Sequence, residues 1–524
     1  MKRFIYLIAF AGVMSLTACS DFLEEYSQDT SYVRNIEDLD ELLLGSVYMP
    51  IAQPWNFAYD WYIGNTAVKD RQWFYPYIHV MGDEAKENLS GSGSSIYNET
   101  NHFFGYFTWQ DQAGINPEGT AVSTESYDWE ALYKFINVAN MVIKKIDDLD
   151  VADNRRIDAD RIKGEAYFLR GAYLFTLVNL YGKPYNPATA SADLGVPVKT
   201  SEFIEDKIFE RATVQQCYDQ VLDDLLTAES LLTNTEKVSN FRADVTAVCH
   251  LLSRVYLYMQ NWDKAAEYAQ KVLSKNRSLQ DLNTLAEDEN FLTAQLPELI
   301  FTMGTGGMRH SIITTSGCYG ISEDLVNAYA DNDLRKSRFI SLTANGWEYV
   351  KEATTNSDLS RSTPSGNFCF RTAEAYLNLA EAQACAGKDN EARQTLNTLR
   401  KARISADAYT DVTASGTELV NAIREERFRE LCFEGHRWFD LRRYTVSAVA
   451  PMSKTIRHSY TTFIYAYDYS VWAYVNKPVM TLWYELAPND PAYTLPIPRE
   501  VLNFNLGMKD NDHPKRNVVE TVNY

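Results

Sequence analysis

Hydrophobic positions recur at helical spacing through two long parts of the chain, about 129–275 and 370–445. In the first part, Trp129, Leu132, Ile136, Ala139 and Ile143 follow one another at intervals of three and four residues. That spacing places them on one face of a helix. Residues 164–181 are apolar around most of the circumference, so we expect this helix to be central and to end before the Gly-Lys-Pro sequence at 182–184.

An internal repeat organises these helices. Residues 251–269 and 375–396 share one layout, two short helical runs around a turn, with small residues at Ser253 and Ala265 in one copy and at Ala380 and Ala392 in the other. Small side chains let two helices approach closely where they cross, as in tetratricopeptide repeats. Segments 164–232 and 419–443 predict two further, less regular pairs.

The helical period fades in three segments, about 50–128, 290–365 and 445–524. The first is crowded with aromatic residues, and the last is rich in Tyr and has no clear helical or strand pattern, so it reads as loop-like. The predicted fold class is therefore mainly α, a scaffold of tetratricopeptide-like helical pairs with irregular, loop-rich ligand-binding segments. We predict that residues 36–524 form a single domain.

The most charged stretch of the chain spans residues 424–443. Read as one helix, it places Arg427, Glu430, Glu434 and Arg437 on one stripe, close to apolar positions such as Trp438. We interpret the stripe as an ion-pair ladder partly sunk into the packing, because a desolvated charge needs a partner.

The alternative is catalytic, with Glu430 and Glu434 as the carboxylate pair of a surface glycosidase. Each carboxylate has an arginine three residues away in the sequence, at Arg427 and Arg437. A neighbouring cation keeps a carboxylate ionised, whereas a general acid needs a raised pKa. The bracing role is therefore the favoured interpretation.

The same stretch resembles the signature of the SusD/RagB family of the Bacteroidetes. The pattern Glu-Arg-x-x-Glu-Leu-x-Phe-Glu-Gly-x-Arg-x-x-Asp-Leu-x-Arg runs from Glu426. Segments 333–339 and 495–498, the second reading Leu-Pro-Ile-Pro, resemble further elements of that family. The resemblance implies a nutrient-binding outer-membrane lipoprotein and not an enzyme. It would capture an oligosaccharide and deliver it to a SusC/RagA-like TonB-dependent transporter, or bind peptides, as RagB-like members do.

The N-terminus reads as an export signal. Two basic residues precede an apolar run from Phe4 to Leu16, which is too short to span a bilayer. The sequence Leu-Thr-Ala-Cys that ends at Cys19 resembles the lipobox of bacterial lipoproteins. This resemblance implies a signal peptide over residues 1–18, lipidation of Cys19 and a tether over residues 19–35, with the protein anchored in the outer membrane and facing the cell surface.

Composition narrows the ligand class. The formal net charge of −20 disfavours nucleic acid, whose binders present a basic face. No cofactor or metal motif is present, and none of the other six cysteines has metal-ligand spacing, so we expect free thiols and no cofactor. The 34 tyrosines suit stacking on sugars or gripping of peptides, because their rings tolerate water.

The family resemblance also points to candidate ligand contacts. Its ligand groups tend to lie before the first helical pair and in the insertion after the second. By position and residue type, these are Phe104, Tyr106 and Trp109, followed by Tyr319 and Trp347. Aromatic faces there would stack on the ligand while polar side chains bind its hydroxyl groups. The residues themselves leave glycan binding, peptide binding and the glycosidase as open alternatives.

Overall fold

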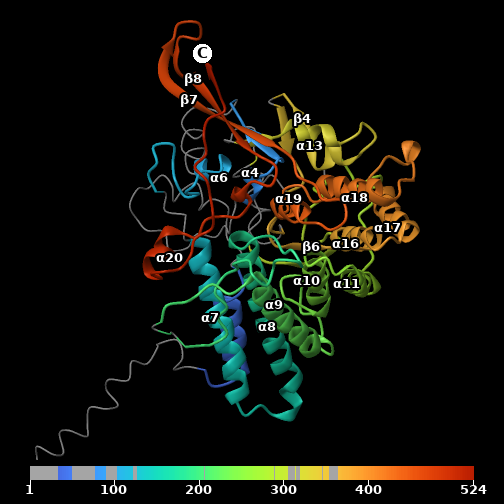
Figure 1. The fold of residues 1–524 in the computed structure, drawn as a ribbon. Coiled ribbons are helices and arrows are strands. Elements are labelled where there is room, and N and C mark those ends of the chain that lie inside the picture. Colours follow the sequence, from blue (N-terminus) through green and yellow to red (C-terminus); the bar gives the residue numbers. More distant parts are fainter. Residues whose placement is uncertain are drawn as a thin grey trace, which may run out of the picture.

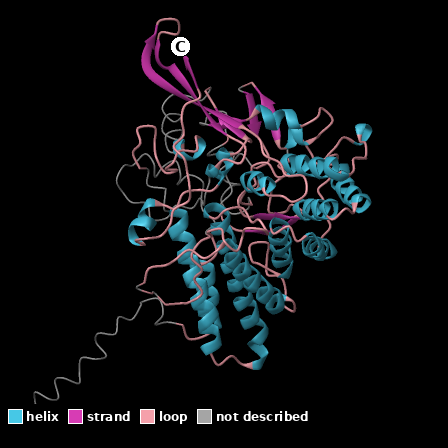
Figure 2. Cartoon of the chain, in the orientation of Figure 1, coloured by secondary structure: helices cyan, strands magenta, loops and turns pink. Residues whose placement is uncertain are grey.

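The computed structural model describes residues 33–49, 77–89, 103–121, 127–203, 205, 207–287, 289–304, 313, 319–344, 346–352 and 364–524. Helices are the main elements of these ranges, and the strands form small sheets (Figures 1 and 2). The expected signal peptide and the lipidation site at Cys19 lie outside the described residues. None of the described helices has the length and apolar composition needed to cross a bilayer.

The four predicted helical pairs are present, which confirms the scaffold. They stack from the lower part of the molecule along one side (Figure 1), and each packs against its neighbour in the series. Their bounds are α8 Arg156–Tyr181 with α9 Val214–Leu232, α10 Val245–Tyr258 with α11 Trp262–Lys275, α16 Thr372–Cys385 with α17 Asp389–Lys401, and α18 Gly416–Glu430 with α19 Arg437–Thr445. Two more helices, α2 (Ile36–Ser46) and α7 (Tyr127–Asp148), pack against α8.

Small residues do bring the paired helices together. Ser253, Ala265, Ala380 and Ala392 are all fully buried. The crossing of α8 and α9 is closer still, since a Cβ added to Gly164 would lie 2.7 Å from a side-chain carbon of the facing helix. Such a contact is shorter than van der Waals packing permits, so the sequence needs glycine there.

Local capping explains where some helices begin. The Thr213 hydroxyl accepts a hydrogen bond from the Gln216 N–H (3.1 Å), and the Gln216 side chain accepts one from the Thr213 N–H (2.9 Å). This reciprocal capping box satisfies two backbone donors at the start of α9. As predicted, α8 ends before Gly182.

The charged stretch 424–443 is not one helix, and this part of the prediction was wrong. Helix α18 ends at Glu430, residues 431–436 form a turn, and α19 begins at Arg437. Phe433 and Gly435 adopt positive φ angles of 55° and 74° inside that turn, a conformation that interrupts a right-handed helix.

The first two of the three segments predicted to be irregular contain defined strands and short helices. The segment after α11 holds β2 (Leu299–Thr302), β3 (Tyr319–Ile321), α13 (Glu323–Ala328), α14 (Arg335–Arg338), β4 (Ile340–Thr343) and β5 (Gly346–Tyr349). Antiparallel pairs join β3 to β1 (Ala85–Glu87), β2 to β6 (Cys369–Arg371), and β4 to β5. Two short helices, α4 (Ile78–Met81) and α6 (Phe104–Phe107), lie near β1 in sequence and structure (Figure 1).

The prediction that the C-terminal segment is loop-like was wrong. Instead of loop, it forms a long antiparallel hairpin of β7 (Ile456–Asp468) and β8 (Ala473–Leu486), to which β9 (Glu520–Asn523) adds a third strand. Helix α20 (Arg499–Phe504) lies between β8 and β9 in sequence. Ile456, His458 and Tyr460 alternate inward at the base of β7, while the outer part of the hairpin projects from the body (Figures 1 and 2).

The described cysteines carry free thiols, as expected. These are Cys217, Cys249, Cys369, Cys385 and Cys432. The sixth, Cys318, lies outside the described ranges.

Candidate ligand-binding groove

The buried charges of residues 424–443 are held by arginines from other elements. Glu430 is fully buried, and its carboxylate accepts hydrogen bonds from Arg335 (2.9 Å), Arg371 (2.7 Å) and Arg403 (2.9 and 3.0 Å). Burial alone would raise the pKa of Glu430, but the three guanidinium groups outweigh it and hold the pKa well below its ordinary value. The bracing role is confirmed, although the partners are not those predicted from the stretch itself.

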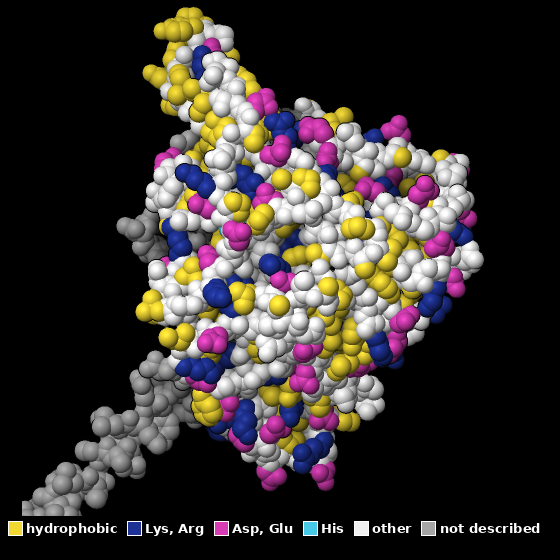
Figure 3. Space-filling view, viewed as in Figure 1, with side chains coloured by type: hydrophobic (Ala, Val, Ile, Leu, Met, Phe, Trp, Pro, Cys, Tyr) yellow, Lys and Arg dark blue, Asp and Glu magenta, His cyan; other side chains and the backbone are white. Residues whose placement is uncertain are grey.

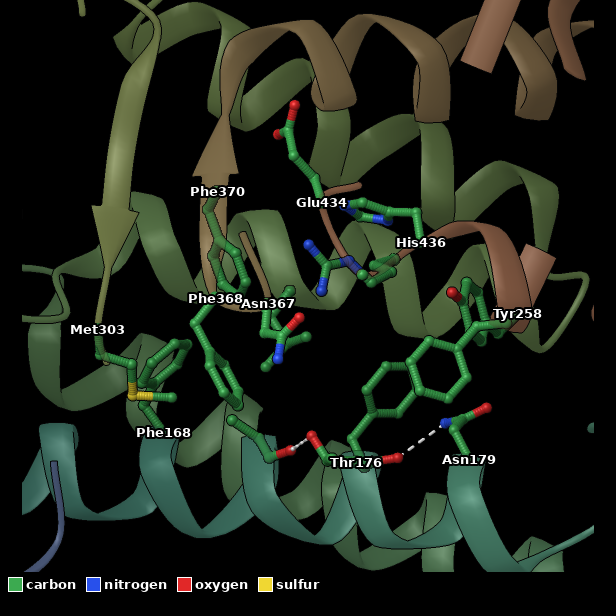
Figure 4. A pocket seen from close by; sticks show the side chains of 16 residues that line it. Phe168, Thr176, Asn179, Tyr258, Met303, Asn367, Phe368, Phe370, Glu434 and His436 are labelled. Atoms are coloured by element: carbon green, nitrogen blue, oxygen red, sulfur yellow. Dashed lines mark hydrogen bonds between the residues drawn. The ribbon is translucent and has the colours of Figure 1, made fainter. Parts of the chain in front are cut away.

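Glu434 belongs to the same network. Its carboxylate accepts from two nitrogens of Arg371, at 2.7 Å each, and forms an ion pair with Lys351. Beside Glu434 lies a cavity of about 40 Å³ against α8, and Figure 4 shows the carboxylate directed away from the other labelled side chains. A cavity of that size holds water and no sugar ring. Neither glutamate is placed or protonated as a general acid requires, so the geometry disfavours the glycosidase alternative.

Arg427 and Arg437 also find partners outside their own stripe. Arg427 donates to Asp440 (2.8 Å), and Arg437 forms a two-bond pair with Asp83 (2.6 and 2.7 Å). Since Asp83 lies just before β1, this second pair ties the charged turn to a different part of the molecule, where a cleft begins.

That cleft is a groove of about 500 Å³ between β1, the start of α13 and the base of the β7–β8 hairpin. Its volume falls within the range of small-molecule binding sites. Both polar and apolar groups line it, from strands on one side and the α13 N-terminus on the other. The lining residues are Asp83, Ala85, Lys86, Glu87, Leu89, Ser322, Glu323, Asp324, Thr455, Ile456, Arg457, His458, Ser459, Thr461, Thr481, Trp483 and Tyr524.

A chain of hydroxyl groups crosses the groove and ends on Glu87. The Glu87 carboxylate accepts from the Ser459 hydroxyl (2.9 Å) and from both the N–H (2.7 Å) and the hydroxyl (2.9 Å) of Thr461. The Thr461 hydroxyl also contacts that of Thr481 (2.7 Å), which in turn contacts the hydroxyl of Tyr524 (3.1 Å).

The direction of this chain follows from proton count. A hydroxyl group has one proton to donate, so Thr481 donates to Thr461, and Tyr524 donates to Thr481. Burial raises the pKa of Glu87, against the hydrogen bonds from Thr461 and Ser459 that lower it. At the exposed end, the Tyr524 oxygen keeps acceptor capacity toward the groove, where a ligand hydroxyl could donate.

An aromatic face and several charges complete the groove. Trp483 is partly exposed, and the Arg457 guanidinium lies 5.2 Å from the centre of its ring. Arg457 also donates to Glu520 (2.7 Å), while Lys86 pairs with Glu323 on the opposite wall. The Arg457 guanidinium therefore packs against the Trp483 ring, and its pair with Glu520 links β7 to β9 beside that ring. Within the described residues, no group of three His, Cys, Asp or Glu side chains is arranged to hold a metal ion.

Two family models match the chain. The model of the SusD family matches residues 327–514, which include the charged turn and the hairpin, and a model described as "starch-binding associating with outer membrane" matches residues 69–257. The chain belongs to the SusD family. The family match at the C-terminal side contains the arginine-braced turn described above.

Two curated relatives of this SusD-family protein come from Formosa agariphila. SusD-like protein P2 is 26% identical over 60% of this chain and 70% of its own length, and SusD-like protein P38 is 24% identical over 62% and 73%. Among solved structures, a putative sugar-binding protein from Bacteroides vulgatus aligns over 91% of this chain and 98% of its own, with 23% identity and a TM-score of 0.66. A laminarin-binding SusD-like protein aligns over 84% and 94%, with 18% identity and a TM-score of 0.56. The structural likenesses support the SusD fold.

Three of the five residues predicted to contact ligand lie in a buried aromatic cluster behind the groove, around His458 and Tyr460 of β7. The His458 ring stacks between Phe107 (4.1 Å between centroids) and Trp109 (4.4 Å). Phe104 meets the ring of Tyr460 edge-on, and Tyr319 meets Phe107 in the same way.

Tyr106 belongs to the same interior and stacks on Tyr77, with the ring centroids 4.0 Å apart. Phe104, Tyr106, Trp109 and Tyr319 are between 1% and 6% exposed, so in this structure they are packed in the interior. Trp347, on β5, is partly exposed. Direct ligand contact by these five residues stays a prediction.

The sequence reading missed the hairpin residues of the groove. Trp483, Arg457 and the threonines at 461 and 481 lie in the segment read as loop. A usable signal was present, because Ile456, His458 and Tyr460 alternate with the polar residues Arg457 and Ser459, and Ile, Tyr and Thr are strand-forming residues. The hydroxyl chain itself depends on pairing between strands, which a single sequence does not reveal.

Proposed function

We propose that this protein binds an oligosaccharide or glycan in the groove between β1, α13 and the β7–β8 hairpin. The observation that carries the proposal is the combination of the partly exposed Trp483 ring with the hydroxyl chain that ends on Glu87. A sugar presents an apolar face to an aromatic ring and hydroxyl groups at its edge, so one ligand satisfies both features. The names of the starch-binding family model and of the laminarin-binding neighbour support this ligand class.

The wider role rests on the family. We propose a lipoprotein anchored in the outer membrane through Cys19 and facing the cell surface. It would pass its glycan to a SusC-like TonB-dependent transporter. The description of the family model that matches residues 69–257 supports outer-membrane association. Phe104, Tyr106, Trp109 and Tyr319 enter the proposal as the rings behind the groove, and Trp347 as a partly exposed candidate contact.

Affinity electrophoresis and isothermal titration calorimetry test the glycan proposal. The wild type is run through gels that contain laminarin, starch or no polysaccharide, and it is then titrated with laminaritriose and maltotriose. We expect retardation and heat of binding with at least one of these glycans. Binding to none of them, together with binding to a peptide library, would favour the RagB-like alternative. Release of reducing sugar would instead support an enzyme.

Trp483→Ala locates the binding site. Loss of the ring removes the stacking face, and we expect about tenfold weaker binding, which corresponds to about 1.4 kcal/mol. The matched control is Phe504→Ala, which removes an aromatic ring that is 88% exposed on α20, outside the groove. Equal affinities of both variants and the wild type would place the glycan elsewhere.

A further inference from the structure

The outer half of the β7–β8 hairpin presents aromatic side chains to solvent. Tyr465, Tyr469, Trp472 and Tyr474 are 72%, 77%, 77% and 61% exposed. Figure 3 shows hydrophobic side chains gathered over this projection, which stands away from the body in Figure 1. Exposed aromatic groups of this kind mark an interaction site more often than isolated surface hydrophobics do.

The strand register connects these rings to the groove. In an antiparallel pair, residues opposite each other share a face, and every second residue along a strand returns to it. Ser459 and Thr461 line the groove and lie opposite Trp483 and Thr481.

The same face continues outward along the hairpin. The cross-strand pairs are Phe463 with Pro478, Tyr465 with Asn476, and Tyr467 with Tyr474. A bulge between Thr462 and Phe463 leaves one extra residue on β8, which keeps these pairs on the groove side. We call Phe463, Tyr465, Tyr467 and Tyr474 the aromatic strip.

The rings of the strip support one another. Tyr465 stacks on Tyr474 with centroids 5.4 Å apart and planes at 24°, and Tyr467 meets Tyr474 edge-on at 5.2 Å. Contacts of this kind restrict the rotamers before any ligand arrives, so binding to the strip costs little side-chain entropy. The strip is therefore a preformed platform.

The distribution of charged residues on the hairpin favours a neutral ligand on the face of the strip. Asp468 and Lys477 form an ion pair at 3.1 Å, and both belong to the face opposite the strip. Pro478 and the Asn476 amide lie on the same face as the strip, and no residue of this face from Phe463 to Tyr467 or from Tyr474 to Pro478 is charged. A neutral chain with apolar faces and hydrogen-bonding edges suits such a surface, as a glycan does.

We propose that the aromatic strip extends the binding groove and takes the outer part of a long glycan chain whose inner part lies beside Trp483. This inference rests on the proposed function. Thr461 and Tyr467 are six residues apart on one strand, a span of about 20 Å at about 3.3 Å per residue. A short oligosaccharide in the groove does not reach the far end of the strip, whereas a polysaccharide does.

The test compares long and short ligands on matched variants. Tyr465→Ala/Tyr474→Ala removes two rings of the strip, and Ile464→Ala, at a 54% exposed position on the opposite face, is the control. Each protein is titrated with laminarin, starch, laminaritriose and maltotriose. We expect the double variant to bind the polysaccharide about tenfold more weakly and the trisaccharide as the wild type does. The control should bind both normally.

The outcomes separate this inference from the proposed function. If the wild type binds none of the four probes, both fail. If the wild type binds and the double variant keeps its polysaccharide affinity, the inference about the strip fails and the proposed function stands. Loss of binding to a protein partner by that variant would not change this result. Equal losses for long and short ligands would also overturn it. Thermal melting checks folding, and if the double variant melts early, Tyr465→Gln alone carries the comparison.

Discussion

Replacement of Glu430 by glutamine tests the bracing role of the buried charges. The substitution keeps the size of the side chain and removes its charge, while Arg335, Arg371 and Arg403 stay around it. The new amide group also presents N–H donors to guanidinium N–H donors, which cannot pair. We expect Glu430→Gln to destabilise the fold.

The size of the effect follows from burial and from the remaining partners. Removal of one member of a buried ion pair costs about 3–5 kcal/mol. Glu430 forms ion pairs with three arginines, but each of these arginines also pairs with at least one other carboxylate. Arg335 has Asp333 and Glu426, Arg371 has Glu298 and Glu434, and Arg403 has Glu298. These partners limit the loss, so we expect about 3–5 kcal/mol and not a multiple of it.

Urea denaturation followed by tryptophan fluorescence measures this loss as a change in the free energy of unfolding. The matched control is Glu267→Gln on α11, whose partners Lys264 and Lys271 lie at 2.8 and 3.5 Å on the surface. Exposed pairs of this kind contribute about 0–1 kcal/mol. The same chemical change should therefore have a much smaller effect at position 267.

The pH dependence has a definite sign. Because the folded-state pKa of Glu430 is held well below its ordinary value of 4.5, its contribution is present above that value. It is lost as the pH falls through the folded-state pKa. The stability gap between wild type and Glu430→Gln should stay constant from pH 8 to about pH 5 and narrow below it. A gap under 1 kcal/mol at pH 7 would refute the reasoning, as would loss of a sugar-releasing activity in a variant of unchanged stability.

Three further predictions concern single groups. Burial raises the pKa of Glu84 to about 8, so its neutral form favours folding and wild-type stability should fall as the pH rises from about 4.5 through 8. Glu84→Gln should flatten that part of a pH series of urea midpoints, and an unchanged slope would contradict it. Gly435→Ala should cost more than Gly387→Ala, because both have φ near 75° but only the first Cβ would meet another group, the Cα of Asn367 at 3.3 Å. Denaturation curves compare the two, and equal losses would count against the close contact. Tyr524→Phe removes the outer hydroxyl and should weaken glycan binding in calorimetry by about 0.5–1.5 kcal/mol with an unchanged melting temperature, whereas unchanged affinity would remove that hydroxyl from the site.

The scaffold could be predicted because its cues are local. Helical periodicity and small residues such as Ser253 and Ala380 mark the paired helices within a few turns of sequence. The interruption of the helix at Phe433 and Gly435 was harder to predict. The stretch is rich in helix-forming residues, and only Gly435 indicates a positive φ angle.

The groove was beyond the sequence reading for a different reason. Its components come from β1, α13, the hairpin and the C-terminal residue, which are hundreds of positions apart. Arg371 and Lys351, which hold Glu434, are likewise distant in sequence. Aromatic residues such as Trp109 carry the same composition signal whether they face a ligand or pack behind a strand, so residue type alone could not separate the two roles.

The most direct measurement of the central claim is a crystal structure with the oligosaccharide that binds best in the titrations. The account predicts a sugar ring stacked on Trp483, with its hydroxyl groups within hydrogen-bond distance of Thr481 or Tyr524. A well-ordered sugar bound elsewhere on the protein, with the groove filled by water alone, would contradict it.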